Sequence, residues 1–475
     1  MTPTKAKEFS NKLEWLNAEP QSLAAHHGRV VLLLFWNASS VYCHNTLANF
    51  YQLQRKYPDA LSVITLHIPK FPGEMETKIL QDAVNRLDVQ LPVANDTQWT
   101  AWQDYGRTCW PSIVLIDPLG MMVAEFDGDE HYPAIEARIL EILESMPRLP
   151  VTKPKAMQVK NRVKTFAALQ CPSGLVLHNG FLYIADSSQH RILECSIDGK
   201  VRRVIGNGLP LFLDGPCAEA SFNRPMGMSV AREYLYVADT GNHAVRRVHL
   251  LNGAVDSILG NGSPGYSDDK TVSAFQDVQL NNPTAISVQQ DILVIADAGN
   301  NCLWMYNQAA RAFSHLVGNG TLGLLDGVGQ RAQMAHPLGL SGSKNFLYCV
   351  EGSNSAVRTV AVPEGRINTV IGHGLYQFGL QDGLRQNASL QHPCAVMADE
   401  KRGVVWVADT YNHKIRSINM LTNQLTSIDM QQVLTHPCAL ALDDESLWIA
   451  DSTSSHLYRY FFESEYLSRI SIQMP

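Results

Sequence analysis

The stretch Leu235-Tyr-Val-Ala-Asp239-Thr-Gly-Asn-His-Ala-Val-Arg246 decides the fold, because versions of it recur through the C-terminal part of the chain. Further copies begin at Leu182, Leu293, Leu347, Val405 and Leu447. Each copy places a short apolar run directly before an acidic residue and a turn, a pattern that is typical of a β-hairpin. Six copies of one hairpin predict a repeat architecture.

An X-Pro dipeptide precedes each copy and marks the period of the repeat. The prolines are separated by 53, 58, 54, 56 and 44 residues, at Pro172, Pro225, Pro283, Pro337, Pro393 and Pro437. In four units a further short strand runs into Gly-Asn-Gly or Gly-His-Gly before the next proline. About four strands in a unit of this length are typical of a β-propeller. We therefore expect residues 161–475 to form an all-β propeller of six blades.

The repeat is similar to that of NHL-repeat propellers. Arg224-Pro-Met-Gly227, Leu235–Asp239 and Asn242–Arg246 carry the resemblance. We expect the Asp after each strand to start a tight turn, where its carboxylate accepts backbone N–H bonds. Glu351 takes this place in the fourth repeat, and its longer side chain predicts a looser turn there.

Closure of the propeller ring requires the last blade to meet the first. Leu467–Ile472, at the end of the sixth repeat, is one candidate for the outer strand. Asn161–Phe166, ahead of the first repeat, is another segment that could pair with the last blade. Either would cover a sheet edge that could otherwise pair with another chain.

Residues 1–146 have a different pattern, in which apolar runs alternate with helical periodicity. Arg29–Asn37 and Leu61–Ile68 are unbroken apolar runs, which indicate strands buried on both faces of a sheet. Helices are predicted at Val41–Lys56, Thr77–Leu87, Gln98–Tyr105 and Tyr132–Met146, and a hairpin at Ile113–Phe126. This order predicts an α/β domain with a mixed sheet. Residues 147–160, with three prolines and three lysines, are predicted to form a linker.

Two segments of this domain resemble the thioredoxin fold. Phe35-Trp-Asn-Ala-Ser-Ser40-Val-Tyr-Cys43 is similar to the strand, Phe-Trp and CxxC of that fold, with Ser40 and Cys43 at the two cysteine positions. Trp110-Pro111-Ser112, ahead of an apolar strand, looks like the cis-proline loop of the TlpA-like redoxins. The resemblance implies that Pro111 is cis and lies opposite the thiol position.

The resemblance also implies a departure from the usual chemistry. The first cysteine of CxxC is the nucleophile, because the helix N-terminus lowers its pKa. Here that position is Ser40, a good helix N-cap. Dithiol exchange needs two thiols. Three interpretations stay open: an inactive remnant in which Cys43 is a buried apolar residue, a monothiol role for Cys43, and a pair formed by Cys43 and Cys109.

The whole arrangement is similar to the NHL repeat-containing protein 2-like family, in which a thioredoxin-like domain precedes an NHL propeller. The redox motif of that family is CxxC preceded by another cysteine. This chain has Ser39 and Ser40 at those places. The resemblance therefore implies the fold without implying the redox activity.

Four long loops follow repeats 1 to 4 and break the regularity of the repeat, at 209–224, 263–282, 321–336 and 375–392. Each carries an acidic turn residue: Asp214, Asp268, Asp326 and Asp382. Equivalent connections leave a propeller on the same face, and long loops on a rigid scaffold are frequent binding sites. We expect a protein partner on this thick-loop face. The alternative is that the loops cover the blades and the Asp residues only form turns.

Histidines and basic residues offer two further candidate sites. His336, His392 and His436 each precede a propeller proline and could converge on the axis as zinc ligands. We instead expect these histidines to be extended, packed locally and without metal, because a residue before proline is restricted to extended backbone. Six basic residues are expected on the solvated blade surface: Arg191, Arg246, Arg247, Arg358, Lys414 and Arg416.

Composition excludes several classes of function. The net charge of −7 and the pI near 6.1 give no reason to expect nucleic-acid binding. Val30–Trp36, the longest apolar run, is too short for a bilayer, and residues 1–22 lack the apolar core of a signal peptide. Nine scattered cysteines fit free thiols in a reducing compartment. We expect a cytoplasmic protein that does not bind membranes.

The sequence therefore predicts an interaction protein that needs no cofactor. It contains neither a phosphate-binding GxxxxGK[ST] motif nor a GxSxG nucleophile elbow. The main alternative is a thiol-disulfide oxidoreductase that uses Cys43, with or without Cys109, and recruits substrates through the propeller. A third alternative is a lyase or hydrolase on the thick-loop face.

Overall fold

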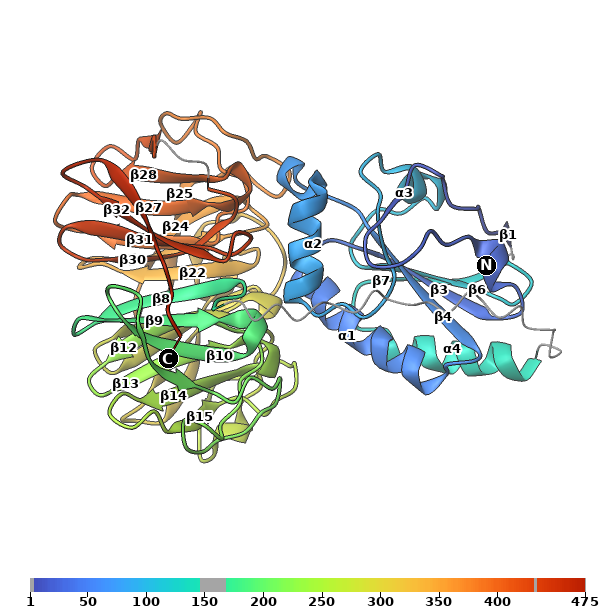
Figure 1. Ribbon diagram of the computed structural model, residues 1–475, viewed down its shortest axis with the longest axis horizontal. Helices are drawn as coiled ribbons and strands as arrows, with labels where there is room; N and C mark the ends of the chain where they lie inside the picture. The colour runs from blue at the N-terminus through green and yellow to red at the C-terminus, as the bar shows by residue number, and fades with distance from the viewer. Residues whose placement is uncertain (1–3, 146–167, 431–433, 475) are drawn as a thin grey trace. The chain divides into compact units, whose positions relative to one another are not determined.

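The computed structural model describes residues 4–145, 168–430 and 434–474 (Figure 1). The chain divides into two units, Met1–Thr165 and Phe166–Pro475, each of which is described by itself. The predicted linker at 147–160 and the candidate strand Asn161–Phe166 lie outside the described residues, so the predicted domain boundaries at 146 and 161 stay predictions.

A seven-stranded mixed sheet forms the first unit, in the order β1-β7-β6-β3-β4-β5-β2. The strands are β1 (Thr4–Lys5), β2 (Glu14–Trp15), β3 (Val30–Trp36), β4 (Leu61–His67), β5 (Val93–Asn95), β6 (Ser112–Ile116) and β7 (Met121–Asp127). β3 pairs in parallel with β4 and antiparallel with β6. All seven residues of β3 are buried, as its unbroken apolar run predicts.

Helices cover both faces of this sheet. They are η1 (Leu23–His26), α1 (Val41–Lys56), η2 (Pro72–Met75), α2 (Thr77–Arg86), α3 (Thr100–Asp104) and α4 (Tyr132–Ser145). Alternate β3 residues, such as Leu34, pack with α1, α2 and α4, and the others, such as Phe35, pack with α3. The Trp110–Pro111 bond is cis. The unit is a thioredoxin-like α/β domain, as predicted.

The second unit is a six-bladed β-propeller, also as predicted, and each blade contains four consecutive antiparallel strands (Figure 1). A short fifth strand pairs with the outer edge of blades 3 and 4, β16 (Lys270–Thr271) and β21 (Gly327–Val328) respectively. The first three blades contain β8 (Pro172–His178), β9 (Phe181–Asp186), β10 (Arg191–Ser196) and β11 (Val201–Ile205); β12 (Pro225–Ala231), β13 (Tyr234–Asp239), β14 (Ala244–His249) and β15 (Val255–Leu259); and β17 (Pro283–Gln289), β18 (Ile292–Asp297), β19 (Cys302–Asn307) and β20 (Ala312–Val317).

The last three blades contain β22 (Pro337–Gly342), β23 (Leu347–Glu351), β24 (Ala356–Ala361) and β25 (Arg366–Ile371); β26 (Ala395–Asp399), β27 (Val404–Asp409), β28 (Lys414–Asn419) and β29 (Leu425–Ser427); and β30 (Pro437–Leu442), β31 (Ser446–Asp451), β32 (His456–Phe461) and β33 (Tyr466–Ile470). Short 3-10 turns follow the acidic residue in blades 1, 2, 3 and 5: η3 (Ser187–Gln189), η4 (Thr240–Asn242), η6 (Ala298–Asn300) and η8 (Thr410–Asn412).

The C-terminal segment helps to close the ring. β33 is the outer strand of blade 6, which confirms the strand predicted at Leu467–Ile472 with slightly different bounds. Beyond it, the N–H of Gln473 donates to the carbonyl of Gly199 and the N–H of Val201 donates to the carbonyl of Gln473, both at 2.9 Å. The end of blade 6 is thereby tied to the start of the outer strand of blade 1.

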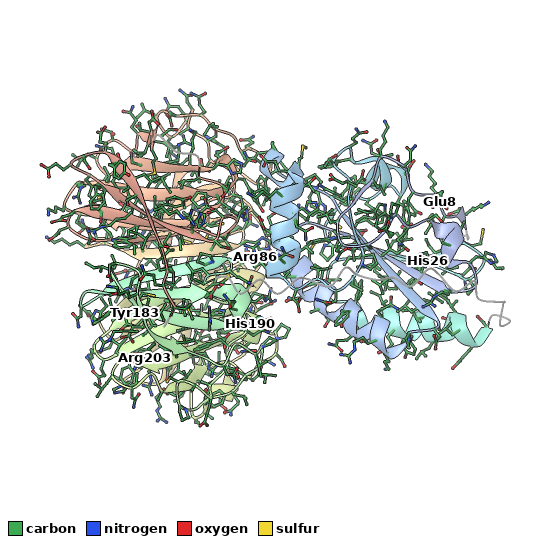
Figure 2. The ribbon with its side chains drawn as sticks, in the orientation of Figure 1. Glu8, His26, Arg86, Tyr183, His190 and Arg203 are labelled. Atoms are coloured by element: carbon green, nitrogen blue, oxygen red, sulfur yellow. The ribbon has the colours of Figure 1, made fainter. Side chains whose placement is uncertain are left out.

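A repeated side-chain contact links successive blades. At five of the six junctions, the residue four positions after the acid accepts a hydrogen bond from the backbone N–H of the pre-proline residue in the next blade. Figure 2 labels the first of these acceptors, His190, whose Nδ1 accepts from the Arg224 N–H at 3.1 Å. The same bond recurs, with the donor N–H named first, from Asn282 to His243, from His336 to Asn301, from His392 to Ser355 and, between blades 6 and 1, from Cys171 to Ser455.

This belt of contacts corrects the expectation that residues before the propeller prolines are extended. Five of them have a φ of +51° to +54°, in the left-handed region: Cys171, Arg224, Asn282, His336 and His392. In each of these residues, the left-handed backbone accompanies a hydrogen bond from the residue's own N–H to the turn of the preceding blade. The signal in the sequence was the recurrent His, Asn or Ser at the acceptor position, which sequence reasoning missed.

None of the helices in the described ranges is both long and apolar enough to cross a lipid bilayer.

Candidate functional site

The structure places Ser40 at the N-cap of α1 but gives it a different partner from the one predicted. Its side chain makes no capping bond to the helix, contrary to expectation. The Ser40 hydroxyl instead hydrogen-bonds with the Cys43 thiol, a contact that acts to lower the pKa of the thiol. The serine at the nucleophile position therefore hydrogen-bonds to the buried cysteine one helical turn further along the chain.

Cys43 is an inaccessible thiol. Its side chain is fully buried in the core cluster that includes Leu34 and Phe50. The Asn37 N–H lies 3.4 Å from its Sγ. Burial raises the pKa of Cys43 to about 12, far outweighing the two hydrogen bonds that act in the opposite direction. At neutral pH the thiol is protonated, and a protonated thiol is a poor nucleophile.

Cys109 is half-buried, two residues before the cis-proline Pro111. Burial, followed by the charge and hydrogen bond of Asp127, raises the pKa of Cys109 to about 11. Cys43 and Cys109 are both free thiols in the structure, as are the other seven cysteines. No disulfide supports the Cys43–Cys109 interpretation.

A buried polar network occupies the region next to the motif. The side chain of Ser39 donates to Asn37 Oδ1, which also accepts the Ser39 N–H at 3.0 Å. Asn37 Nδ2 in turn donates to the carboxylate of buried Glu74 at 2.8 Å, and that carboxylate also accepts the Lys70 and Phe71 N–H groups. Ser39, at a place where the resembled family has cysteine, is thus a member of a structural network.

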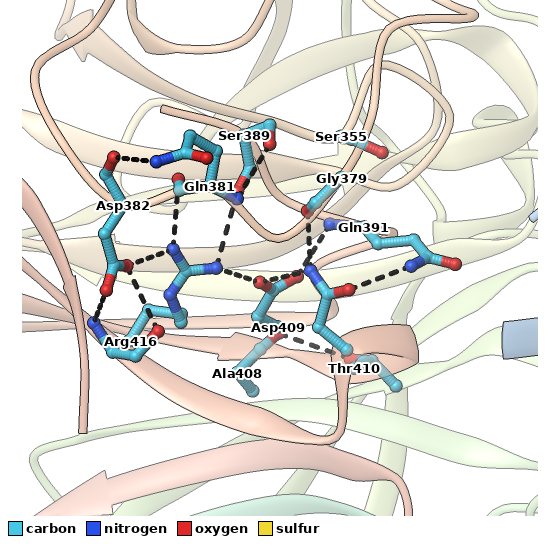
Figure 3. Close-up of polar contacts among 12 residues, drawn as sticks. Ser355, Gly379, Gln381, Asp382, Ser389, Gln391, Ala408, Asp409, Thr410 and Arg416 are labelled. Carbon is cyan, nitrogen blue, oxygen red and sulfur yellow. Dashed lines mark hydrogen bonds and ion pairs between the residues drawn. The ribbon is translucent and has the colours of Figure 1, made fainter. Parts of the chain in front are cut away.

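Each repeat acid is a buried hub of its blade, as Figure 3 shows for blade 5. Asp409 accepts the backbone N–H of Gln391 at 2.7 Å, the side-chain amide of Asn412 at 2.8 Å and the guanidinium of Arg416 at 2.7 Å. The predicted role as an acceptor of backbone N–H bonds is confirmed. The accepted N–H comes from the segment before the proline of the same blade.

Glu351, whose longer side chain predicts a looser turn, makes the same set of bonds as the aspartates. It accepts the Ala335 N–H at 3.0 Å and the amide of Asn354, and it forms an ion pair with Arg358 at 2.8 Å. Its turn is hydrogen-bonded but is not a 3-10 helix, as is also true of blade 6, which has Asp451.

Three of the basic residues predicted on the solvated surface are instead fully buried: Arg246, Arg358 and Arg416. Each guanidinium lies between two carboxylates, one from the repeat acid and one from the preceding long loop. The loop partners are Asp214 at 2.7 Å, Asp326 at 3.0 Å, and Asp382. Two carboxylates around one cation allow these arginines to be buried.

Each of the four long loops also pairs with the outer strand of the blade that follows it. The residue after the loop acid pairs with the outer strand of its blade, through Gly215 with Val255, Lys270 with Phe313, Gly327 with Ile367, and Gly383 with Leu425. The loop acid then accepts a hydrogen bond two residues further along that strand, as Asp326 does from Thr369 Oγ1 at 2.6 Å. The loops therefore cover the outer edges of blades 2 to 5.

In one of the four loops, the acid that bonds to the outer strand is not the one predicted. In the loop at 263–282 the acid in this position is Asp269, which accepts the His315 N–H at 2.7 Å. Asp268, the residue predicted for this loop, is exposed beside it. Asp214, Asp326 and Asp382 keep about 40% of their side chains exposed (40%, 38% and 44%) although they bind arginine.

A third contact fixes the loops on one face of the propeller. In blades 2 to 5, the Asn three positions after the repeat acid donates its side-chain amide to a loop carbonyl at 2.7 to 2.9 Å, from Asn242 to Leu211, Asn300 to Gly265, Asn354 to Gly323 and Asn412 to Gly379. These loops also present exposed apolar side chains, at Leu209, Leu211, Leu213, Tyr266, Leu325, Val328, Leu380 and Leu384. The thick-loop face is therefore tied to the blades by hydrogen bonds and is partly apolar.

The three pre-proline histidines have local packing partners. His336 Nδ1 lies 2.7 Å from Ser353 Oγ. The ring of His392 stacks on Tyr411 with centroids 4.7 Å apart, and Tyr411 also packs against His436 at 5.4 Å. Within the described parts of the chain, no three His, Cys, Asp or Glu side chains gather in a group that could hold a metal ion.

Comparison with known proteins supports both halves of this description. The chain is 30% identical to bovine (Bos taurus) NHL repeat-containing protein 2 over 464 residues, which cover 89% of this chain and 63% of that protein. It is also 30% identical to Protein SUPPRESSOR OF QUENCHING 1, chloroplastic, of Arabidopsis thaliana, over 97% of this chain and 47% of that one. The chain thus spans less than two thirds of the length of these two relatives. No family model matches it.

The N-terminal unit has separate relatives. It is 20% identical over 136 residues to thiol-disulfide oxidoreductase YkuV of Bacillus subtilis, a match that covers 29% of this chain and 92% of that protein. The chain therefore resembles NHL repeat-containing protein 2 over most of its length and thiol-disulfide oxidoreductases over its first domain.

Proposed function

We propose that the chain is an interaction protein in which a thioredoxin-like domain without redox activity accompanies a propeller that binds a protein partner on its thick-loop face. The observation that carries this proposal is the state of Cys43, which is fully buried, with its pKa raised to about 12, behind a serine at the nucleophile position. A thiol in this state supports a structural role better than thiol exchange.

The second candidate function is thiol-disulfide exchange through Cys43, with the propeller recruiting the substrate. The similarity of the first domain to an oxidoreductase favours it. It requires a conformation in which Cys43 reaches solvent. The nine free cysteines fit either function in a reducing compartment, and we infer a cytoplasmic location from them.

Alkylation of the native protein distinguishes the two candidates. At about pH 7.5 we expect Cys43 to react at least about a hundredfold more slowly than a free thiol, because only thiolate reacts. The Ser40→Cys variant is the matched control, since residue 40 is only half-buried and sits at a helix N-terminus, so its thiol should react fast. Peptide mass spectrometry after timed quenching gives both rates. Fast labelling of Cys43 in the unmodified protein would favour the redox function.

The thick-loop face is supported as the binding surface by its exposed apolar side chains. We expect the paired change Leu211→Asp and Leu213→Asp to weaken partner binding by about tenfold or more, since apolar anchors commonly carry binding energy. Leu251→Asp is the matched control. Leu251 is 85% exposed in the β14–β15 turn, at the end of the blade opposite to the loops.

The measurement is the affinity of a partner isolated with the unmodified chain, titrated against each variant after its thermal unfolding has been checked. Equal affinities for the loop variant and for the Leu251→Asp variant would place the binding surface elsewhere.

A further inference from the structure

Blade 3 departs from the charge pattern of blades 2, 4 and 5. The residue seven positions after its acid is Trp304 instead of arginine, and this tryptophan is fully buried. Trp304 Nε1 donates to Asp297 Oδ2 at 3.0 Å. The Asp297 carboxylate also accepts the Asn281 N–H and the Asn300 side-chain amide, each at 2.7 Å. Asp297 is therefore held by three N–H groups, and no cation pairs with it among the described residues.

The groups around Asp297 supply no compensating positive charge. From β19, the Cys302 thiol is fully buried and has a pKa raised well above its usual value by burial and by Asp297 itself. From β20, His315 packs edge-on against Trp304, and burial lowers the pKa of its imidazole, so it is neutral near pH 7.

The loop at 263–282 also brings no cation to Asp297 among the described residues. Tyr266 packs against Trp304 from this loop, and burial raises the pKa of Tyr266, with smaller effects of Cys302, Asp268, Asp269 and Asp297. The ammonium of Lys270 donates to the carbonyl of Asp277 at 3.0 Å. A carboxylate in such surroundings is costly to keep ionised.

The same loop covers this buried carboxylate. Its residue Asn281 supplies one of the three N–H groups, and its Gly265 carbonyl accepts the other N–H of the Asn300 amide at 2.8 Å. The ring of Tyr266 lies 5.3 Å from that of Trp304. Opening of the loop would therefore remove a hydrogen bond from Asp297 and admit water to it.

We propose that the loop at 263–282 is a pH-sensitive lid on blade 3, closed more tightly in mildly acidic solution than at neutral pH. The lid follows from Trp304 at the arginine position and does not depend on the proposed function. Burial raises the pKa of Asp297 to about 7, and an opened loop would return it toward 3.8. The raised pKa of Asp297 stabilises the closed loop fully when the pH is below 3.8, the value in the open state. This stabilisation is lost as the pH rises to about 7, the value in the closed state.

Blade 5 provides an internal reference. Burial also raises the pKa of Asp409, but the neighbouring Arg416 opposes this effect and the value is about 6. Its loop at 375–392 should therefore stop responding near pH 6. Between about pH 6 and about pH 7 only the blade 3 loop should continue to loosen.

Hydrogen–deuterium exchange of the full chain tests the lid. We expect the protection of the 263–282 peptides, corrected for the pH dependence of intrinsic exchange, to fall by up to about tenfold per pH unit up to about pH 7 and then to level off. Protection of the 375–392 peptides should be constant above about pH 6. An unchanged 263–282 loop, or equal changes in both loops, would overturn the proposal.

Two variants separate the lid from general effects of pH. Trp304→Arg restores the cation found in blades 2, 4 and 5 and should remove most of the pH response above about pH 6. Asp297→Asn removes the titrating group and should abolish the response. If Asp297→Asn does not fold, Trp304→Arg and the comparison of the two loops still test the proposal. A pH response of the 263–282 loop that persists in Trp304→Arg would contradict the lid.

Discussion

Replacement of Arg416 by methionine is expected to lower the free energy of unfolding of the propeller by about 3–5 kcal/mol, because it leaves a buried carboxylate without its counter-charge. Arg416 and Asp409 both have fully buried side chains, and Arg416 Nη1 lies 2.7 Å from Asp409 Oδ2. The change also releases Asp382 and two loop carbonyls, of Gln381 and Ser389 (Figure 3). Circular dichroism during heating should show a melting temperature lower by about 5–15 °C.

Two further variants show whether the lost stability comes from the buried charge. Arg247→Met is the control: Arg247 follows Arg246, the blade 2 counterpart of Arg416, but its side chain is 30% exposed and binds the exposed Asp256, so its loss should cost at most about 1 kcal/mol. Adding Asp409→Asn to Arg416→Met should recover part of the loss, because the fully buried carboxylate is then removed and only the partly exposed Asp382 lacks its partner. A loss no larger than that of Arg247→Met would show that the buried pair contributes little.

The spacing of these residues shows what the sequence contained and what was missed. The loop acid and the buried arginine are 32 residues apart in blades 2 and 4 and 34 apart in blade 5. An acid and a base that recur at a nearly constant separation indicate a pair. Sequence reasoning treated the two sets separately, as binding residues and as surface residues. Their burial could not be predicted because it depends on how a loop folds back over the next blade.

Elements were predictable where one local signal determined them. The bounds of α1 were predicted to the residue, because apolar positions at helical spacing follow a buried strand and a cap residue. The six blades followed from the proline period. The left-handed backbone at Arg224 was not predictable, since it depends on an acceptor, His190, contributed by another blade.

The redox motif illustrates the same division between local and tertiary information. Ser40 and Cys43 could be aligned with a CxxC from the sequence, which revealed the missing nucleophile. The depth at which Cys43 is buried is a property of the packed domain, in which β3, α1, α2 and α4 surround it. The sequence alone therefore could not show how accessible the Cys43 thiol is.

Replacement of Gly174 by alanine should lower the free energy of unfolding of the propeller by about 3 kcal/mol, at the upper end of the range for overpacking. Gly174 lies in β8, where the inner strand of blade 1 packs on blade 2. A Cβ at this position would lie 2.1 Å from the carbonyl oxygen of Met226 in β12. Because the obstacle is backbone, no side-chain rotation can relieve the contact, and the two blades must separate.

The fold itself does not exclude a methyl group at this position, since blades 3, 5 and 6 have Ala285, Ala395 and Ala439 two residues after their prolines. The expected cost is therefore specific to the close approach of blades 1 and 2. Gly342→Ala is the matched control, because its Cβ would meet only side-chain atoms at 3.5 Å and should change stability by less than about 0.5 kcal/mol. Thermal unfolding of the two variants in parallel measures the difference. Equal melting temperatures would show that the first two blades can move apart at little cost, and that the hydrogen-bonded belt, more than strand packing, holds the ring together.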